Sequence, residues 1–417
     1  MTNQIPNRIA QKTFMALTIL VGLYAVITLA YTVKMGTTIR FPDESEYLCL
    51  ASNLVATGHY TLDGSTPTAY RPPAYPLLLA AGMKFGLPIT ALRVANASTL
   101  LACMALLYFL LRKTSAAQAR IAVLLVMAYP VLLYTAGTFY PQIPAAAFFL
   151  AAVAMLFTVA NPGILRFLFA GAVLGITILM VPTFIFSLLF TAFFFAGRSQ
   201  RLIGMRNAAT LLVGATLILT PWIARNALTF HTFLPISTNN GISLLTGNNE
   251  QATCNAGVTA GLTRHLQATK GLSEIEADAY YRREALQFIR THPREAFNLY
   301  LAKAANYYNF RNTLAMQSES SPTRDLIMLV SYGFLLVTAG LRIFLWRRHP
   351  LTQLERYSAY LYVLNGLFSA VFFTRIRFRL PMDILLMILA SATLLVLAKY
   401  AINRRAVAQA ELNPPHP

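Results

Sequence analysis

Long runs of apolar residues follow one another along most of the chain, with short polar stretches between them. Several runs reach or approach the ~20 residues that a helix needs to cross a bilayer, and together they predict about ten membrane-spanning helices. The predicted spans are residues 13–33, 88–111, 119–137, 142–160, 166–180, 182–197, 207–226, 325–345, 357–373 and 381–401. The fifth and sixth are short and split around Val181-Pro182, so one broken helix is the alternative.

Two polar segments remain outside the predicted spans, at about residues 34–87 and 227–324. The second opens with STNNGISLLTGNNEQ, whose Asn and Gly residues predict a loop. Ser273 and Glu276 then form the S-x-x-E pattern of a capping box, which predicts the start of a helix. A second amphipathic helix is expected from Pro293 onward. We expect both helices to lie against the outer membrane surface or the spans.

The apolar runs and polar segments divide the chain into three regions. An N-terminal membrane module (1–226) carries the first outer loop, an outer helical region (227–324) follows, and a C-terminal membrane module (325–417) completes the chain. The residues are 56% hydrophobic and 12% charged, far from the soluble average. The first run is too long for a cleaved signal peptide, so it is expected to stay as a span. The sequence therefore predicts an all-α polytopic membrane protein.

The formal net charge of +19 is distributed unevenly across the predicted membrane. One side collects Arg8, Lys12, Arg112, Lys113, Arg120, Arg166, Arg198, Arg201, Arg206, Arg347, Arg348, Arg356, Arg404 and Arg405. Only Glu355 and Glu411 among the acidic residues fall on that side. The positive-inside rule makes it cytoplasmic, which places both termini inside and the two polar segments outside the plasma (inner) membrane, facing the periplasm or exterior. The charge is thus a topology signal, and no nucleic-acid partner is expected.

Cysteines and short motifs exclude several classes of protein. No C-x-x-C, H-E-x-x-H, Walker or G-x-G-x-x-G pattern is present, which removes the usual soluble-cofactor functions. Cys103 lies within a predicted span. Cys49 and Cys254 fall in the two outer segments, and whether they form a disulfide in an oxidising compartment is left open.

An acidic cluster stands just past the first span, in FPDESEY. Asp43, Glu44, Glu46 and Asp63 are the only carboxylates before residue 250. Carboxylates so close to a bilayer are costly to desolvate, which favours a functional site for proton abstraction or metal binding. The alternative is an ordinary solvated loop at a helix start, because Pro42 precedes the acidic residues. Two adjacent carboxylates without a third ligand make a poor metal site, so no obligatory metal or other cofactor is expected.

Arginines accompany the acidic cluster on the outer side. Arg71 stands in TAYRPPAYP, Arg225 follows Pro221-Trp222, and Arg375, Arg377 and Arg379 alternate in FTRIRFRLP. Guanidinium groups suit phosphate oxygens, although contact with lipid head groups or snorkelling to the interface also explains such residues. One base together with several arginines is the set that sugar transfer from a lipid phosphate requires. A general acid is unnecessary because the phosphate leaves as a stable anion.

The motifs resemble a known family when they are taken in order. PDESEY, ASNLVATGHY, YRPPAYPLLLA, TPWIARN, FLPISTNNGISLLTGNN, THPREAFNLYLAK and RIRFRLP are similar to those of C-type fold membrane glycosyltransferases, in the branch of protein O-mannosyltransferases and the lipid A aminoarabinose transferase. The resemblance implies a polyprenyl-phosphate-linked sugar as donor, transfer with inversion, and a lipid, glycan or protein as acceptor. It also implies Asp43 as the base with Glu44 beside it. The implied substrate-binding residues are Tyr70, Arg71, Arg225, Lys303, Arg375, Arg377 and Arg379.

Two departures from the family pattern and two competing functions leave the specificity open. Relatives often carry Glu where this chain has Gln142, and Arg before Pro where it has Val181-Pro182; the chain also ends soon after the last predicted span. A transporter or flippase of lipid-linked sugars is the main alternative, and it predicts internal repeats and charges buried within spans, neither of which the sequence suggests. A non-catalytic receptor or scaffold would leave the acidic cluster and the arginines without a role. The sugar and the acceptor stay undetermined.

Overall fold

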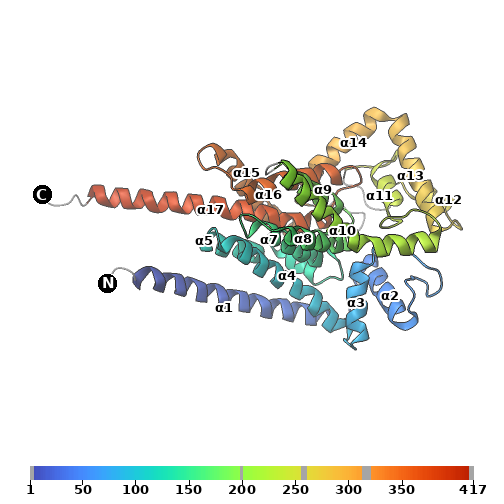
Figure 1. The fold of residues 1–417 in the computed structure, drawn as a ribbon, viewed down its shortest axis with the longest axis horizontal. Coiled ribbons are helices and arrows are strands. Elements are labelled where there is room, and N and C mark those ends of the chain that lie inside the picture. The colour runs from blue at the N-terminus through green and yellow to red at the C-terminus, as the bar shows by residue number, and fades with distance from the viewer. Residues whose placement is uncertain (1–3, 198–200, 255–260, 312–320, 413–417) are drawn as a thin grey trace.

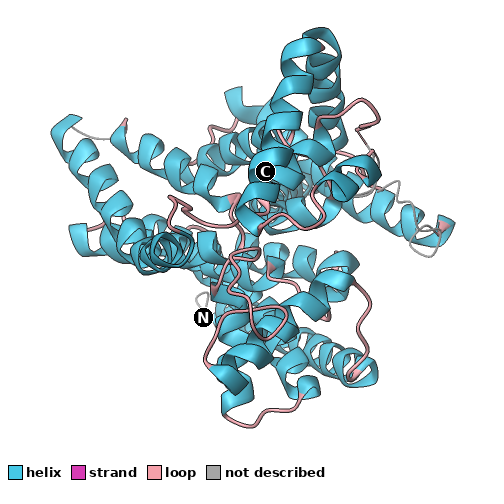
Figure 2. Cartoon of the chain, turned by 90° about the vertical axis from the view of Figure 1, so that its right-hand side faces the viewer, coloured by secondary structure: helices cyan, strands magenta, loops and turns pink. Residues whose placement is uncertain are grey.

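The computed structural model describes residues 4–197, 201–254, 261–311 and 321–412. Across these residues every named element is a helix, and one isolated bridge joins Thr61 to Pro67. The first and last described helices, α1 (Gln4–Met35) and α17 (Ile376–Leu412), begin and end at one end of an elongated helical bundle. The helices α2 (Pro42–Thr57) and α3 (Ala74–Lys84), and those from α11 (Asn240–Gly247) to α14 (Pro293–Asn306), lie at the other end (Figure 1). Figure 2 looks onto that second end, where loops connect short helices. The two segments that the sequence places outside the membrane therefore share one end of the molecule.

The helices of the N-terminal half are α1 (Gln4–Met35), α2 (Pro42–Thr57), α3 (Ala74–Lys84), α4 (Ile89–Arg112), α5 (Ala116–Met127), α6 (Pro130–Ala136), α7 (Gln142–Phe157), α8 (Ile164–Met180), α9 (Phe184–Ala196) and α10 (Arg201–Phe230). Those of the remainder are α11 (Asn240–Gly247), α12 (Thr263–Ala268), α13 (Glu274–Thr291), α14 (Pro293–Asn306), α15 (Pro322–Phe344), α16 (Gln353–Ser369) and α17 (Ile376–Leu412), with a 3₁₀ turn at Leu345–Arg347.

Five described helices are long and apolar enough to cross a membrane, namely α1, α4, α10, α15 and α17. The pair α5 and α6, bent by 65° at a short break, makes a sixth if it counts as one span. All ten predicted ranges fall on helices, and the prediction of an all-helical polytopic membrane protein is confirmed. The count of about ten full spans is not reached among the described residues, since α7, α8 and α9 are apolar but short.

Close contact between α8 and α10 depends on small residues. An added Cβ at Gly171 would lie 1.9 Å from the Leu211 carbonyl oxygen, and one at Gly214 would lie 2.0 Å from that of Leu168. Small residues let two membrane helices approach each other closely, which compensates for the weak hydrophobic drive between helices in lipid. The α8 helix ends at Met180, where the Val181-Pro182 step separates it from α9. The break therefore lies where the sequence predicted it, between two short apolar helices.

The outer segments are joined to each other by hydrogen bonds. The Ser273–Glu276 capping box forms as predicted and begins α13. One residue along, Glu274 accepts hydrogen bonds from the Thr68 hydroxyl (2.6 Å) and the Ala69 amide (2.9 Å) of the first outer loop. Asp278 of the same helix accepts from the Gly241 amide at 2.6 Å, which fixes α11 against α13. These bonds join the loop before α3 and the helix α11 to one and the same helix, α13.

Several sequence predictions need correction or a limit. The stretch read as a loop, STNNGISLLTGNNEQ, contains the helix α11. Cys49 and Cys254 are both free thiols. The predicted helix from Pro293 is confirmed, and its Phe297 and Leu301 are 60% and 49% exposed, so these apolar side chains point away from the protein. Of the basic residues used for orientation, Arg198 lies outside the described residues, as do the side chains of Arg8 and Arg405 and that of the acidic Glu411.

Candidate active site

A cavity of about 220 Å³ lies where the outer segments meet the membrane bundle. Its walls come from α2, the loop before α3, the start of α7, the α8–α9 break, α11, and the loop that leads into α17. Met180, Val181, Phe372 and Phe373 give it an apolar side. Asp43, Arg71 and Arg377 are the charged residues among its described lining. The sequence segments around residues 43, 71 and 377 therefore share one site.

Each carboxylate oxygen of Asp43 accepts a hydrogen bond from a different arginine. Arg71 Nη2 donates to Oδ1 at 2.9 Å, and Arg377 Nη1 donates to Oδ2 at 2.6 Å. Arg377 Nη1 also donates to the Tyr140 hydroxyl at 2.9 Å, while Arg71 Nε donates to Glu46 at 2.7 Å. The three side chains are only 13–24% exposed. The predicted base thus lies between two of the predicted phosphate-binding arginines.

The surroundings of Asp43 keep it ionised. Burial opposes the charged form, but Arg377 and Arg71 outweigh it and hold the pKa of Asp43 below its usual range. Its position in the first turn of α2 acts in the same direction, because the positive end of a helix dipole favours an anion. Asp43 is therefore always ready to accept a proton and is a weak base while both arginines hold it.

Helix N-termini add to the positive charge of the cavity. The lining includes Asp43 at the start of α2, Gln142 at the start of α7, Thr183 just before α9 and Asn240 at the start of α11. The first amides of a helix lack intrahelical partners and attract anions. In addition, Arg377 Nε is buried without a hydrogen-bond partner. Two guanidinium groups beside a single carboxylate give the cavity a net positive charge, which favours an anion.

Glu44 does not share the cavity with Asp43. Its side chain is fully buried, where Oε1 accepts from the Arg40 and Phe41 amides and Oε2 accepts from the Phe139 amide at 2.8 Å. Arg93 lies 3.6 Å away as its counter-ion. Adjacent residues on a helix point about 100° apart, so an acidic pair in sequence need not act together in space. The structure places Glu44 as an anchor that fixes α2 and hence Asp43.

The three alternating arginines also separate. Arg379 is 1% exposed, pairs with Asp383 at 3.0 Å, and donates to the Tyr307 and Asn309 carbonyl oxygens. Arg375 lies outside the lining of the cavity, near the Phe373 ring. The cause is that α17 begins at Ile376, so alternate residues face opposite sides of a helix. Arg379 and Asp383 form a buried ion pair within the last candidate span, so the expectation of no charges buried within spans is wrong. Buried charges therefore do not separate a transferase from a transporter.

The other predicted binding residues support the cavity walls. Tyr70 lines the cavity, with the Arg71 guanidinium 5.1 Å above its ring. Arg225 lies outside the lining, where its Nη1 donates to the Thr68 carbonyl at 2.9 Å. Lys303 is fully buried, and its ammonium donates to the Gly247 and Phe372 carbonyls at 2.8 and 2.9 Å. It therefore ties α11 to the loop before α17.

Sequence reasoning missed most of the uncharged lining. The wall formed by α11 and the residues before it is rich in amides and hydroxyls. Its polar members are Ser237, Asn239, Asn240, Ser243 and Thr246. This stretch belongs to one of the family-like motifs, but nothing in it indicated that its side chains line a cavity, whereas Gln142 stood out as a departure from the family pattern. Among the described residues, no three His, Cys, Asp or Glu side chains gather to hold a metal ion.

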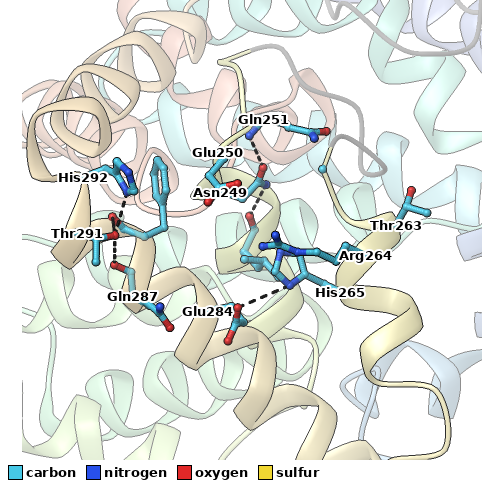
Figure 3. Close-up of a pocket in the computed structure, with 13 residues that line it drawn as sticks. Asn249, Glu250, Gln251, Thr263, Arg264, His265, Glu284, Gln287, Thr291 and His292 are labelled. Carbon is cyan, nitrogen blue, oxygen red and sulfur yellow. Dashed lines mark hydrogen bonds and ion pairs between the residues drawn. The ribbon is translucent and has the colours of Figure 1, made fainter.

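A second cavity, of about 600 Å³, lies on another side of α11 (Figure 3). Leu245 and Asn249 line it, as do residues of α12 and α13 that include His265 and Glu284, whose closest polar atoms are 4.0 Å apart. Its lining is polar, but among its described residues no carboxylate lies between two arginines as Asp43 does. The helix α11 therefore contributes to two cavities, of which the one at Asp43 is the candidate active site.

The fold and the site together define a multi-span helical membrane protein with a charged cavity at one end of its bundle. No protein-family model and no curated protein matches the chain. It is similar to the crystal structure of ArnT from Cupriavidus metallidurans bound to undecaprenyl phosphate, with 14% identity, 90% of this chain and 78% of ArnT covered, and a TM-score of 0.47.

A second similar structure is the archaeal oligosaccharyltransferase AglB from Archaeoglobus fulgidus, in complex with an inhibitory peptide and a dolichol-phosphate. The identity is 14%, the TM-score is 0.47, and 93% of this chain and 51% of AglB are covered. This chain thus spans about half the length of AglB.

Proposed function

We propose that this protein is a glycosyltransferase that moves a sugar from a polyprenyl-phosphate donor to an acceptor at the outer face of the membrane. The observation that carries the proposal is Asp43, held between Arg71 and Arg377 at the edge of the bundle. The site supplies a proton acceptor and two phosphate-binding groups within one cavity. Apolar residues at the α8–α9 break, such as Met180 and Val181, offer a surface for the isoprenoid chain.

The reaction assigns one role to each charged group. An acceptor hydroxyl oxygen attacks the anomeric carbon as its proton passes to Asp43. The bond between the anomeric carbon and the phosphate oxygen breaks, and the electron pair leaves with the polyprenyl phosphate. Arg71 and Arg377 stabilise the charge that develops on that phosphate, which preorganised donors in a partly buried site do effectively. Attack opposite the leaving group inverts the anomeric configuration.

Donor binding activates the base in this mechanism. The phosphate competes with Asp43 for the same guanidinium groups, and the unpartnered Nε of Arg377 is one donor ready for it. Once the arginines are shared with the phosphate, less positive charge acts on Asp43 and its basicity rises. The carboxylate favours a transferase over a transporter in this proposal, because a permanent anion weakens binding of the phosphate, whereas proton transfer gives that anion a role.

The reaction is tested in proteoliposomes that contain the full chain and a polyprenyl-phosphate donor with a radiolabelled sugar. An octyl hexoside serves as a lipid-like acceptor and a Ser/Thr-containing peptide as a protein-like one. We expect labelled acceptor of inverted configuration together with free polyprenyl phosphate. Movement of intact donor across the bilayer without bond cleavage would instead establish the transporter. Asp63→Asn, in the same outer loop but outside the cavity lining, is the matched control for Asp43→Asn.

The orientation is tested separately with an impermeant thiol reagent in intact cells. Ser65 is exposed in the first outer loop, and Ala116 is exposed at the start of α5, toward the end with the termini. We expect Ser65→Cys to be labelled and Ala116→Cys to be protected, as the positive-inside distribution requires. The reverse pattern would place the cavity in the cytoplasm and contradict transfer at the outer face.

A further inference from the structure

The cavity contains a buried polar group that the reaction scheme above does not use. Gln142 is the first residue of α7, lines the cavity and is only 6% exposed. Its amide oxygen Oε1 has no hydrogen-bond partner. A buried acceptor without a partner destabilises a protein, and such groups are rare in native structures unless a ligand completes them. The amide of Gln142 is thus positioned for a hydrogen bond from a bound molecule.

The location of Gln142 indicates which part of the donor it meets. Two residues earlier, the Tyr140 hydroxyl accepts a hydrogen bond from Arg377, the arginine that also binds Asp43. Gln142 and the charged centre thus line the same cavity, and in the proposed reaction the phosphate and the anomeric carbon bind at that centre. Within the same cavity stand the amides and hydroxyls of the α11 wall, among them Asn240 and Ser243. Such uncharged groups suit the hydroxyls of a sugar ring.

The charges around the cavity restrict the kind of sugar. Asp43 is the carboxylate among the described lining residues, and both of its oxygens are taken by Arg71 and Arg377. An ammonium group on the sugar would enter a cavity whose lining carries two guanidinium groups and a single carboxylate. Burying an unpaired cation close to like charges is strongly unfavourable. A hydroxyl, by contrast, can donate to Gln142 without any change in charge.

We propose that Gln142 is a specificity-determining residue that accepts a hydrogen bond from a hydroxyl of the donor sugar, and that the sugar transferred is uncharged. This rests on the proposed function for the phosphate site, and it adds a separate sugar subsite. Arg71 and Arg377 bind any polyprenyl phosphate, whereas Gln142 distinguishes a donor that carries a sugar from the bare lipid phosphate.

The test measures equilibrium binding of two radiolabelled lipids to the purified full-length protein in detergent. One lipid is polyprenyl phosphate, and the other is the same lipid with a neutral hexose. Gln142→Met keeps an unbranched side chain of similar length and removes the amide. We expect Gln142→Met to weaken binding of the hexose lipid about tenfold, the loss of one hydrogen bond, and to leave the bare lipid unchanged. Arg377→Met should weaken both.

Gln118→Met is the matched control, because Gln118 is a buried glutamine (7% exposed) outside this cavity. It should bind both lipids as the wild type does, which shows that loss of a buried amide alone has no effect on binding. Equal binding of the hexose lipid by Gln142→Met and the wild type would overturn the sugar subsite. Failure of the wild type to bind even the bare lipid would overturn the phosphate site, and with it the proposed function.

A second variant tests the charge of the sugar and does not depend on the loss of an interaction. Gln142→Glu adds a carboxylate of the same shape. In transfer assays, we expect the wild type to prefer a neutral hexose donor over the matching amino-hexose donor, and Gln142→Glu to shift that ratio of kcat/KM toward the amino sugar by tenfold or more. An unchanged ratio, or a wild type that prefers the amino sugar, would contradict the proposal.

Discussion

Two aspartate–arginine pairs each contain an arginine of α17, and they differ in exposure and in the groups around them. Asp43 and Arg377 are 21% and 24% exposed and line a cavity. Asp383 and Arg379 are 0% and 1% exposed, and both oxygens of Asp383 are occupied by hydroxyls of Tyr129 and Tyr362 in addition to the guanidinium. The two arginines stand only two residues apart, yet one faces a cavity and the other faces packed side chains.

The comparison shows that environment, more than residue type, separates a reactive pair from a structural one. The Asp383 pair is buried among packed side chains and leaves no surface for a substrate, so it joins α17 to the chain around Tyr307 and Asn309. The Asp43 pair is partly exposed and lines the cavity, so it is open to a substrate on one side. The first of the following predictions compares the two pairs directly, the next two alter the Asp43 pair, and a further one concerns the buried Lys303.

The largest expected effect on stability comes from Arg379→Met. The change would leave Asp383 as a buried charge without its counter-ion, which costs about 3–5 kcal/mol. Arg377→Met should cost about 1 kcal/mol or less, because Asp43 keeps Arg71 and contacts water. Thermal unfolding in detergent checks both variants together. Similar losses in the two would show that the Asp43 pair is structural as well.

Replacement of a cavity arginine by lysine should cause a large loss of turnover. Arg377→Lys retains the positive charge but loses the planar guanidinium that now contacts Asp43 and Tyr140 together. We expect kcat/KM for the donor to fall about tenfold or more, by analogy with the loss of a charge-assisted hydrogen bond. Arg375→Lys, outside the cavity lining, serves as the control and should retain wild-type kinetics. Equal kinetics for both variants would remove Arg377 from the phosphate site.

The pH dependence of transfer should depend on the arginines. Burial raises the pKa of Asp43, and Arg377 together with Arg71 lowers it further than burial raises it. Transfer should therefore stay constant down to the acidic range and fall only when Asp43 becomes protonated. Arg377→Ala removes a lowering contribution, so the acid limb should move to higher pH. The pH profile of kcat/KM, which reports the free enzyme, reads the position of the limb independently of the overall rate. An unmoved limb would contradict Asp43 as the base.

The smallest expected effect concerns Lys303, a buried cation whose bonding partners are neutral oxygens. Burial lowers the pKa of Lys303 to about 8. Above that pH the folded protein releases this proton while the unfolded chain still holds it, so the contribution of Lys303 to the unfolding free energy rises with pH. We expect the stability of the wild type relative to Lys303→Met to increase as the pH is raised through about 8. Unfolding midpoints from pH 7 to 9.5 measure it, and a relative decrease would contradict the assignment.

The sequence was sufficient for the helical membrane fold and for the charged centre, because apolar runs and rare outer charges are local signals. Asp43, Arg71 and Arg377 were each identified, and the helix start at Pro42 was correct. The sequence did not show which members of a cluster share a face. Glu44 and Arg379 turn inward because α2 and α17 are helices, and Asp383 was overlooked because it is hidden in an apolar run. The α11 wall depends on long-range contacts to Asp278 and Lys303 that no local pattern reveals.

The most direct test of the central claim measures sugar transfer and thermal stability together for Asp43→Asn and Asp383→Asn. The claim is that the first pair is catalytic and the second is structural. Asp43→Asn should lose on the order of 10²–10⁴-fold in transfer rate, as expected for removal of a positioned base, and retain donor binding and its unfolding midpoint. Asp383→Asn should lower the unfolding midpoint, and the protein that remains folded should transfer sugar at the wild-type rate. Near-normal transfer by Asp43→Asn would contradict the account.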